Sequence, residues 1–115
     1  MSGCSPTDHY DCAVAVSFTP PPDQLLSMPI GSIERDLWVN TLSPLLAAQH
    51  AVQGFEELPA TAKKVFIYTG NILNSAVLAV PAFFTLGMGK AASAYWVGAS
   101  DLNYSKNGYR YEWSF

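Results

Sequence analysis

The sequence predicts an α/β fold in which three strands and two helices alternate around one parallel sheet. Short apolar runs of strand length are separated by long segments with helical spacing, in the order strand, helix, strand, helix, strand. This alternation is typical of parallel sheets with right-handed crossovers. At 115 residues, 50% hydrophobic and 13% charged, the chain is long enough for one domain, residues 1–115, and too apolar to be disordered.

The first strand and the first helix are predicted from a change of apolar spacing. The run Cys12–Phe18, "CAVAVSF", is short and apolar, and the three prolines of "TPPP" that follow cannot donate ladder hydrogen bonds. After Ser32, the expected N-cap, apolar residues recur at helical spacing. We therefore expect a buried strand and then a long amphipathic helix over Ile33–Phe55.

A proline interrupts this helix. Pro44 has no N–H, so the carbonyl of Asn40 loses the donor that a regular helix would supply. Two interpretations stay open: a tolerated kink, or an oxygen that is freed for another donor.

The second half of the chain supplies two more strands and one more helix. Val65–Tyr68, "VFIY", is continuously apolar, which predicts a strand buried on both faces, and it runs directly into "TGN". Residues Phe83–Ser105 can form a helix, and a turn at Asn107–Gly108 leads to an aromatic strand, Tyr109–Trp113. In parallel sheets, ligands bind outside the carboxyl ends of the strands, here near Phe18–Pro20, Thr69–Asn71 and the last residues of the chain.

Charge and composition argue against several classes of partner. The net charge is -3 and the six basic residues are spread out, so we expect no nucleic-acid binding. Cys4 and Cys12 are too few for a disulfide framework, and without other ligands at the right spacing beside them they do not indicate a zinc site. The longest apolar run, Ser75–Gly89, contains Pro81 and is shorter than a bilayer span, and no secretion signal is recognisable. A cytoplasmic protein without membrane contact is predicted.

The glycines before Lys90 resemble a phosphate loop only superficially. Such a loop needs a glycine six positions before the lysine and a serine or threonine after it, and these positions hold Phe84 and Ala91. No dinucleotide-binding glycine fingerprint occurs in the chain, and no serine or cysteine has the context of a hydrolase nucleophile.

Four phrases nevertheless resemble one enzyme family. "RDLWVNT", "VFIYTGNILN", "LGMGKAASAY" and "NGYRYEW" make the chain, from about Cys12 to Trp113, similar to the second half of the nucleotide-binding domain of short-chain dehydrogenases/reductases, especially a compact fungal branch. The resemblance implies a partial Rossmann-like βαβαβ unit of three layers with a three-stranded parallel sheet. It also implies NAD or NADP as cofactor and a small carbonyl or hydroxyl compound as substrate.

The resemblance also implies residue roles. Asn40 matches an asparagine whose helix-kink carbonyl holds a water in a proton relay. Lys90 matches the lysine that lowers the pKa of the catalytic tyrosine and holds the nicotinamide ribose. Thr69, with Asn71 as competitor, matches the hydroxyl that bonds the substrate carbonyl, and Ala13 lies where the family contacts the adenosine side of the cofactor.

Two departures weaken the implied chemistry. Leu86 occupies the place of the catalytic tyrosine, four residues before Lys90, and leucine has no proton to transfer. Tyr68 at the strand end is a possible substitute, although a structural role is the simpler interpretation. With the glycine fingerprint also missing, a truncated, weakly active or inactive relative is predicted.

Other functions remain open. One alternative is a noncatalytic domain that forms homo-oligomers through its two long helices, using the first helix together with Ala91, Ala94 and Val97. A third hypothesis, a cofactor-free isomerase or dehydratase, would use Tyr68 and Lys90.

Overall fold

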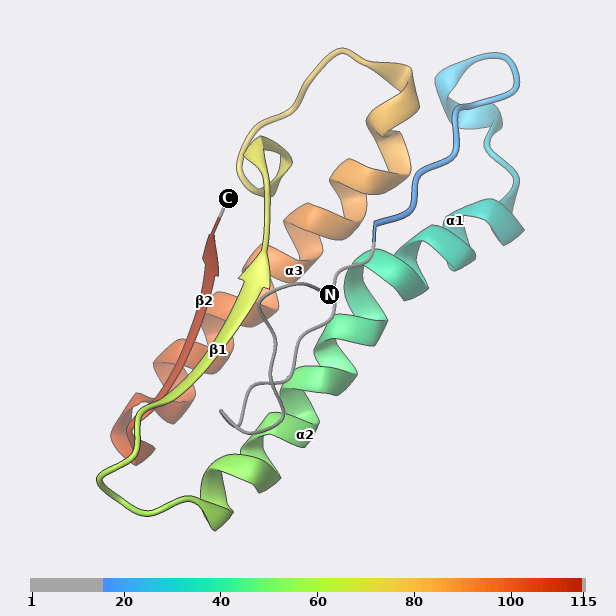
Figure 1. Ribbon diagram of the computed structural model, residues 1–115. Helices are drawn as coiled ribbons and strands as arrows, with labels where there is room; N and C mark the ends of the chain where they lie inside the picture. The colour runs from blue at the N-terminus through green and yellow to red at the C-terminus, as the bar shows by residue number, and fades with distance from the viewer. Residues whose placement is uncertain (1–15, 115) are drawn as a thin grey trace.

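The computed structural model describes residues 16–114, which form helices packed against a small sheet. Figure 1 shows the long helices side by side with the two strands along them. The elements are, in order, η2 (Leu25–Ser27), α1 (Ile30–Leu37), η3 (Trp38–Leu42), α2 (Ser43–Glu57), β1 (Lys64–Thr69), η4 (Ile72–Asn74), η5 (Pro81–Phe83), α3 (Phe84–Tyr104), η6 (Ser105–Asn107) and β2 (Tyr109–Ser114).

The first helical run is continuous from α1 through η3 to α2. It begins at Ile30 directly after Pro29, so the predicted N-cap at Ser32 is wrong. η3 is a π-helical turn, in which the N–H of Ser43 bonds to the carbonyl of Trp38. The wider turn lies just before Pro44, and such insertions relax the backbone where a helix bond cannot form.

The sheet is parallel, as predicted, but it has two strands and not three among residues 16–114. β1 pairs with β2 in a register that runs from Lys64 opposite Tyr109 to Thr69 opposite Ser114. α3 forms the crossover between them, as expected of an α/β unit. The expected segments 65–68, 83–105 and 109–113 correspond closely to β1, α3 and β2.

The predicted first strand is not seen in the part of the chain that is described. Residues 12–15 lie outside the described range, and Val16–Phe18 are not in a strand. The reason lies in Ser17, whose N–H donates to Asn40 Oδ1 at 3.1 Å and whose carbonyl accepts from Asn40 Nδ2 at 2.5 Å. The Asn40 side chain therefore forms hydrogen bonds with both backbone groups of Ser17, which a neighbouring strand would otherwise pair.

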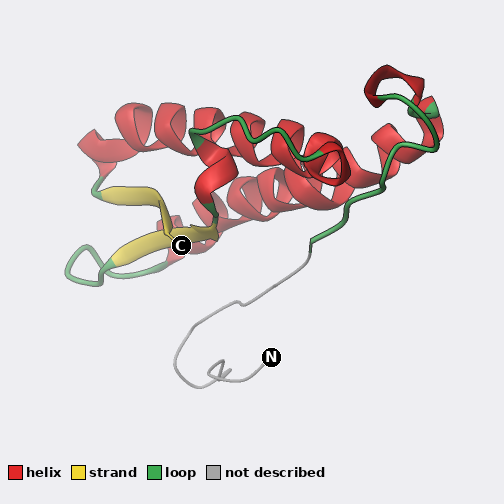
Figure 2. Ribbon diagram, turned by 90° about the horizontal axis from the view of Figure 1, so that it is seen from above, coloured by secondary structure: helices red, strands yellow, loops and turns green. Residues whose placement is uncertain are grey.

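The helices cover one face of the sheet, so the described residues form two layers and not the predicted three. Figure 2, viewed from above, shows the long helices on one side of the strands. On the other face, Val65 is 42% exposed and Ile67 is 59% exposed. Burial of β1 on both faces was therefore wrong. Although the run is apolar throughout, burial alternates along it: Phe66 and Tyr68 point into the core, and their neighbours do not.

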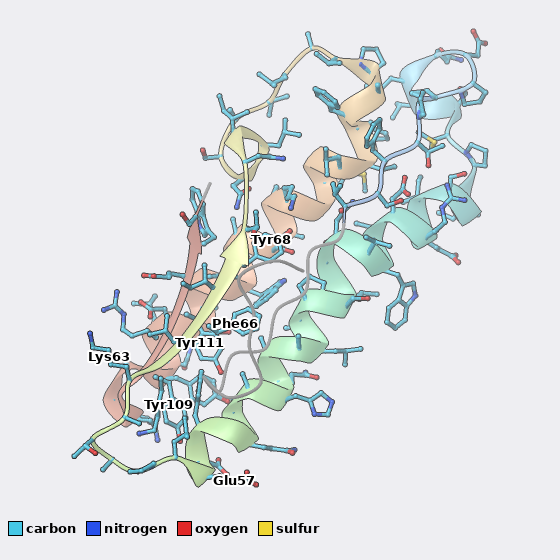
Figure 3. The ribbon with its side chains drawn as sticks, in the orientation of Figure 1. Glu57, Lys63, Phe66, Tyr68, Tyr109 and Tyr111 are labelled. Atoms are coloured by element: carbon cyan, nitrogen blue, oxygen red, sulfur yellow. The ribbon has the colours of Figure 1, made fainter. Side chains whose placement is uncertain are left out.

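The core beneath the covered face is aromatic. Tyr68, Tyr109 and Tyr111 are buried together with residues of the helices, and Figure 3 labels them with Phe66 along the two strands. The Phe66 and Tyr111 ring centroids are 5.6 Å apart. Aromatic pairs of this kind contribute about 0.5–1.5 kcal/mol each beyond the area they bury. No helix within residues 16–114 has both the length and the apolar character that a bilayer crossing requires.

Candidate functional site

Lys90 lies at the carboxyl end of β1. Its side chain extends from α3 and only 6% of the residue is exposed. The Nζ atom donates to the carbonyl oxygen of Thr69 at 2.9 Å and lies 4.7 Å from the centroid of the Tyr68 ring. The ring face and the carbonyl both stabilise a positive charge. A fixed cation therefore stands where α/β proteins bind their ligands.

A glycine brings Lys90 close to the broken helix. A Cβ at Gly89 would lie 2.5 Å from the Cβ of Asn40, so no larger residue fits without moving a helix. The same close approach lets the Thr41 hydroxyl donate to the Gly89 carbonyl at 3.0 Å. At this point the side chains of η3 pack directly against the backbone of α3 at Gly89, the residue next to Lys90.

The carbonyl oxygen of Asn40 accepts hydrogen bonds from two side-chain hydroxyls. Tyr68 Oη donates to this oxygen at 2.9 Å and Ser93 Oγ donates at 2.8 Å. Pro44 has no N–H to offer, which explains why the oxygen is available. Since a carbonyl has two lone pairs, both acceptor positions are in use. The water relay implied for Asn40 thus requires that one hydroxyl gives way or passes the proton itself.

Tyr68 fits a structural role. It is 7% exposed, its hydroxyl proton is directed at Asn40, and its ring packs against Trp96 with centroids 6.0 Å apart. A phenol held in this way is poorly placed to give its proton to a substrate.

Thr69, Asn71 and Leu86 occupy the other predicted positions. Thr69 offers Lys90 its backbone carbonyl, while its exposed side chain follows the uncovered face of β1. Asn71 is the N-cap of η4, and its Oδ1 accepts from the N–H of Leu73 at 2.8 Å. Leu86 is buried on α3, one turn before Lys90. Ala13 lies outside the described residues, so its predicted contact with the cofactor stays a prediction.

A buried carboxylate beside the site was missed by the sequence analysis. Asp36 is 0% exposed and accepts from Ser17 Oγ at 2.5 Å and from Thr85 Oγ1 at 2.7 Å. Burial alone raises the pKa of this carboxyl, but hydrogen bonds from Ser17, Thr85 and Thr19, with the charge of Arg35, bring the pKa below its ordinary value. The available signal was an acid one helical turn before Asn40, in "RDLWVN".

The residues present fit the nicotinamide side of a dinucleotide better than the adenosine side. Lys90 supplies a cation at the end of β1, and Asn74, in the turn η4 that follows β1, has a buried amide nitrogen with no hydrogen-bond partner among residues 16–114. No glycine-rich phosphate-binding turn is present in the sequence. Within the described range, no cluster of three or more His, Cys, Asp or Glu residues is arranged to hold a metal ion.

A parallel α/β unit with a buried lysine at the carboxyl end of its first strand is consistent with part of a Rossmann-like fold. A curated protein supports this interpretation: the chain is 40% identical over 101 residues to the short chain dehydrogenase/reductase dmxR12 of Cryptosporiopsis sp. (strain 8999). The match covers 88% of this chain and 40% of the relative. The chain is thus related in sequence to the short-chain dehydrogenases/reductases, and it spans about two-fifths of that relative's length. No protein-family model and no solved structure matches it.

Proposed function

We propose that this chain provides the nicotinamide and substrate side of a short-chain dehydrogenase/reductase site and that, taken by itself, it has little or no catalytic activity. The observation behind this proposal is the Lys90 ammonium bonded to Thr69 at the carboxyl end of a parallel strand. The relationship to a short-chain dehydrogenase/reductase supports NAD or NADP as the cofactor. A bound cofactor would supply hydride exchange with a carbonyl or hydroxyl compound.

Lys90 would have two tasks in such a site. A lysine ammonium has three donors, and the Thr69 carbonyl takes one of them. The other N–H groups can bond the hydroxyls of the nicotinamide ribose. The same positive charge can stabilise negative charge that develops on a substrate oxygen. Lys90 is almost completely buried, so water screens this interaction little, and its Thr69 bond already fixes the position of the ammonium.

The missing proton donor accounts for the low activity that we propose. Leu86 cannot transfer a proton, and the Tyr68 hydroxyl is already bonded to Asn40. A general acid contributes on the order of 10²–10⁴ in rate, so a site without one is slow even when its cofactor is in place.

Cofactor binding and turnover test this proposal separately. Binding of NADH and NADPH is measured by cofactor fluorescence, and oxidation over a panel of ketones by absorbance. We expect weak binding by the wild type, loss of binding in Lys90→Ala, and no change in Lys106→Ala, a control lysine on η6. Equal, background-level binding in all three proteins would remove the proposal. A high turnover rate would remove only its low-activity part.

A second candidate function is homo-oligomerisation through the first helical run. Trp38, Leu42 and Leu46 recur every four residues and are 51%, 36% and 47% exposed. Such a stripe on one helix face is typical of a contact surface. Val97, named above for this interface, is only 1% exposed and belongs to the core, so that part of the expectation was wrong.

The assembly state can be measured by light scattering over a range of concentrations. We expect an oligomer that Leu46→Glu dissociates and that Leu102→Glu, an exposed control on α3, leaves intact. A wild type that stays monomeric at high concentration would contradict this second function.

A further inference from the structure

The short turn after β1 holds one side-chain amide in a fixed orientation. In η4, the Oδ1 atom of Asn74 accepts from the backbone N–H of Asn71 at 2.8 Å, and Asn71 Oδ1 accepts from Leu73 at 2.8 Å. These bonds form a reciprocal capping box. Because a backbone N–H can only donate, the oxygen of Asn74 must face Asn71, and the amide nitrogen points the other way.

That nitrogen has no acceptor among residues 16–114. Asn74 is 8% exposed, and its Nδ2 is a buried donor without a hydrogen-bond partner. An unmet buried donor costs about 1–3 kcal/mol, and native proteins contain few of them. The nitrogen lies against the backbone, since a Cβ at Gly70 would be 2.6 Å from it. Gly70 directly follows Thr69, the residue whose carbonyl holds Lys90.

The structural task of Asn74 does not need the nitrogen. The capping box requires only an oxygen that accepts from Asn71. An aspartate could provide this oxygen as well, because a carboxylate oxygen accepts the same bond from the Asn71 N–H. The amide nitrogen is therefore unexplained by the fold, and it lies against Gly70, the residue that follows the Thr69 carbonyl bonded to Lys90.

We propose that Asn74 Nδ2 is a ligand-binding donor of the Lys90 site, and that it bonds an uncharged carbonyl or hydroxyl oxygen of the nicotinamide cofactor or of the substrate. This inference rests on the proposed function. An uncharged oxygen suits a neutral amide donor, while Lys90 supplies the positive charge nearby. Because Nδ2 is covered by its surroundings, the proposal requires η4 to shift when the ligand binds.

The side-chain amide signal of Asn74 reports this bond directly. In ¹H–¹⁵N spectra of the whole chain, with assignments from triple-resonance data, we expect its Nδ2 protons to move downfield when ligand binds. NAD⁺ alone is one arm of the titration, and NAD⁺ with cyclohexanol is the other. A shift with NAD⁺ alone assigns the acceptor to the cofactor, whereas a shift only after cyclohexanol assigns it to the substrate.

Two variants separate ligand binding from folding. Asn74→Asp keeps an oxygen for Asn71 but has no donor, and we expect ligand affinity to fall roughly tenfold, the loss of one hydrogen bond. Asn103→Asp makes the same change at another side-chain amide, an exposed one on α3 whose Nδ2 donates to the Ala99 carbonyl. This control should leave ligand affinity within about twofold of the wild type, and urea unfolding of both variants shows whether either has lost its fold.

The outcomes distinguish this inference from the function on which it rests. Binding that depends on Lys90 while the Asn74 amide signal stays unmoved overturns the inference and leaves the proposed function in place. Absence of binding in both arms overturns both. If Asn74→Asp does not fold, the wild-type amide signal decides by itself.

Discussion

Replacing Gly89 with alanine tests the close contact that joins Lys90 to the broken helix. The new Cβ would lie 2.5 Å from Asn40 Cβ and 3.2 Å from Thr41 Oγ1. Carbon atoms pack best at about 3.5–4.0 Å, so α3 and η3 must separate by roughly 1 Å. Asn40 Cβ is attached to backbone, and a rotamer change cannot move it out of the way.

The expected energy follows from two opposing terms. Overpacking of this kind costs about 1–3 kcal/mol, while alanine in place of glycine in a helix gains about 1 kcal/mol. Gly98→Ala is the matched control, because it lies in the same helix and its new Cβ meets nothing within 4 Å. Gly98→Ala should therefore show only the gain in stability that alanine brings over glycine in a helix. The difference between the two variants is the overpacking term, about 1–3 kcal/mol.

Urea unfolding followed by tryptophan fluorescence measures this difference, and the chain has three tryptophans to report it. We expect the midpoint of Gly89→Ala to lie below that of Gly98→Ala with an unchanged slope. Cofactor binding should weaken only in Gly89→Ala, because Lys90 moves with the helix. Equal midpoints for the two variants would refute the close contact and the site geometry built on it.

Three further predictions concern buried polar groups. The pKa of Asp36 is lowered in the folded chain, so its carboxylate stabilises the fold above the ordinary pKa, and this stabilisation disappears as pH falls below about 3.9. In Asp36→Asn, the urea midpoint should fall less steeply as the pH is lowered. An unchanged fall would show that Asp36 does not cause the loss of stability in acid. Burial, with two neighbouring tyrosines, raises the pKa of Tyr111 to about 12. Stability should therefore be complete below pH ~10 and fall as pH rises toward the folded pKa, by an amount on the order of 2–3 kcal/mol, and Tyr111→Phe should remove most of that fall. Tyr68→Phe and Ser93→Ala each leave one donor on the Asn40 carbonyl, so in a double-mutant cycle we expect the combined variant to lose more stability than the sum of the two, because only then is the buried oxygen unpaired. Strict additivity would show that the two hydroxyls do not share this acceptor.

Local sequence patterns predicted most of the secondary structure. The helical spacing of "TLGMGKAASAY" and the aromatic run near the C-terminus correspond to α3 and β2. Pro44 predicted an orphan carbonyl at Asn40, and the structure shows that oxygen bonded to side-chain hydroxyls. These predictions succeeded because helix periodicity and the missing N–H of proline act within a few residues along the chain.

The expectations that failed involved partners far away in the sequence. Val16–Phe18 have apolar character typical of a strand, but Asn40, 23 residues from Ser17, takes the backbone bonds of that segment. The burial of β1 was overestimated for a related reason. A continuous apolar run does not reveal whether helices cover one face of a sheet or both.

Some features of the candidate site follow from the local sequence, and others depend on distant residues. The sequence alone determined that a lysine follows two glycines, that a leucine lies four residues before this lysine, and that a proline interrupts the preceding helix. Only the tertiary structure decided that the hydroxyls of Tyr68 and Ser93, 28 and 53 residues from Asn40, donate to its carbonyl oxygen. It also decided that Lys90 reaches the end of β1. The physical reason is that residue type and local backbone chemistry are properties of neighbouring residues, whereas the acceptor that a buried donor finds depends on which distant segments the folded core brings together.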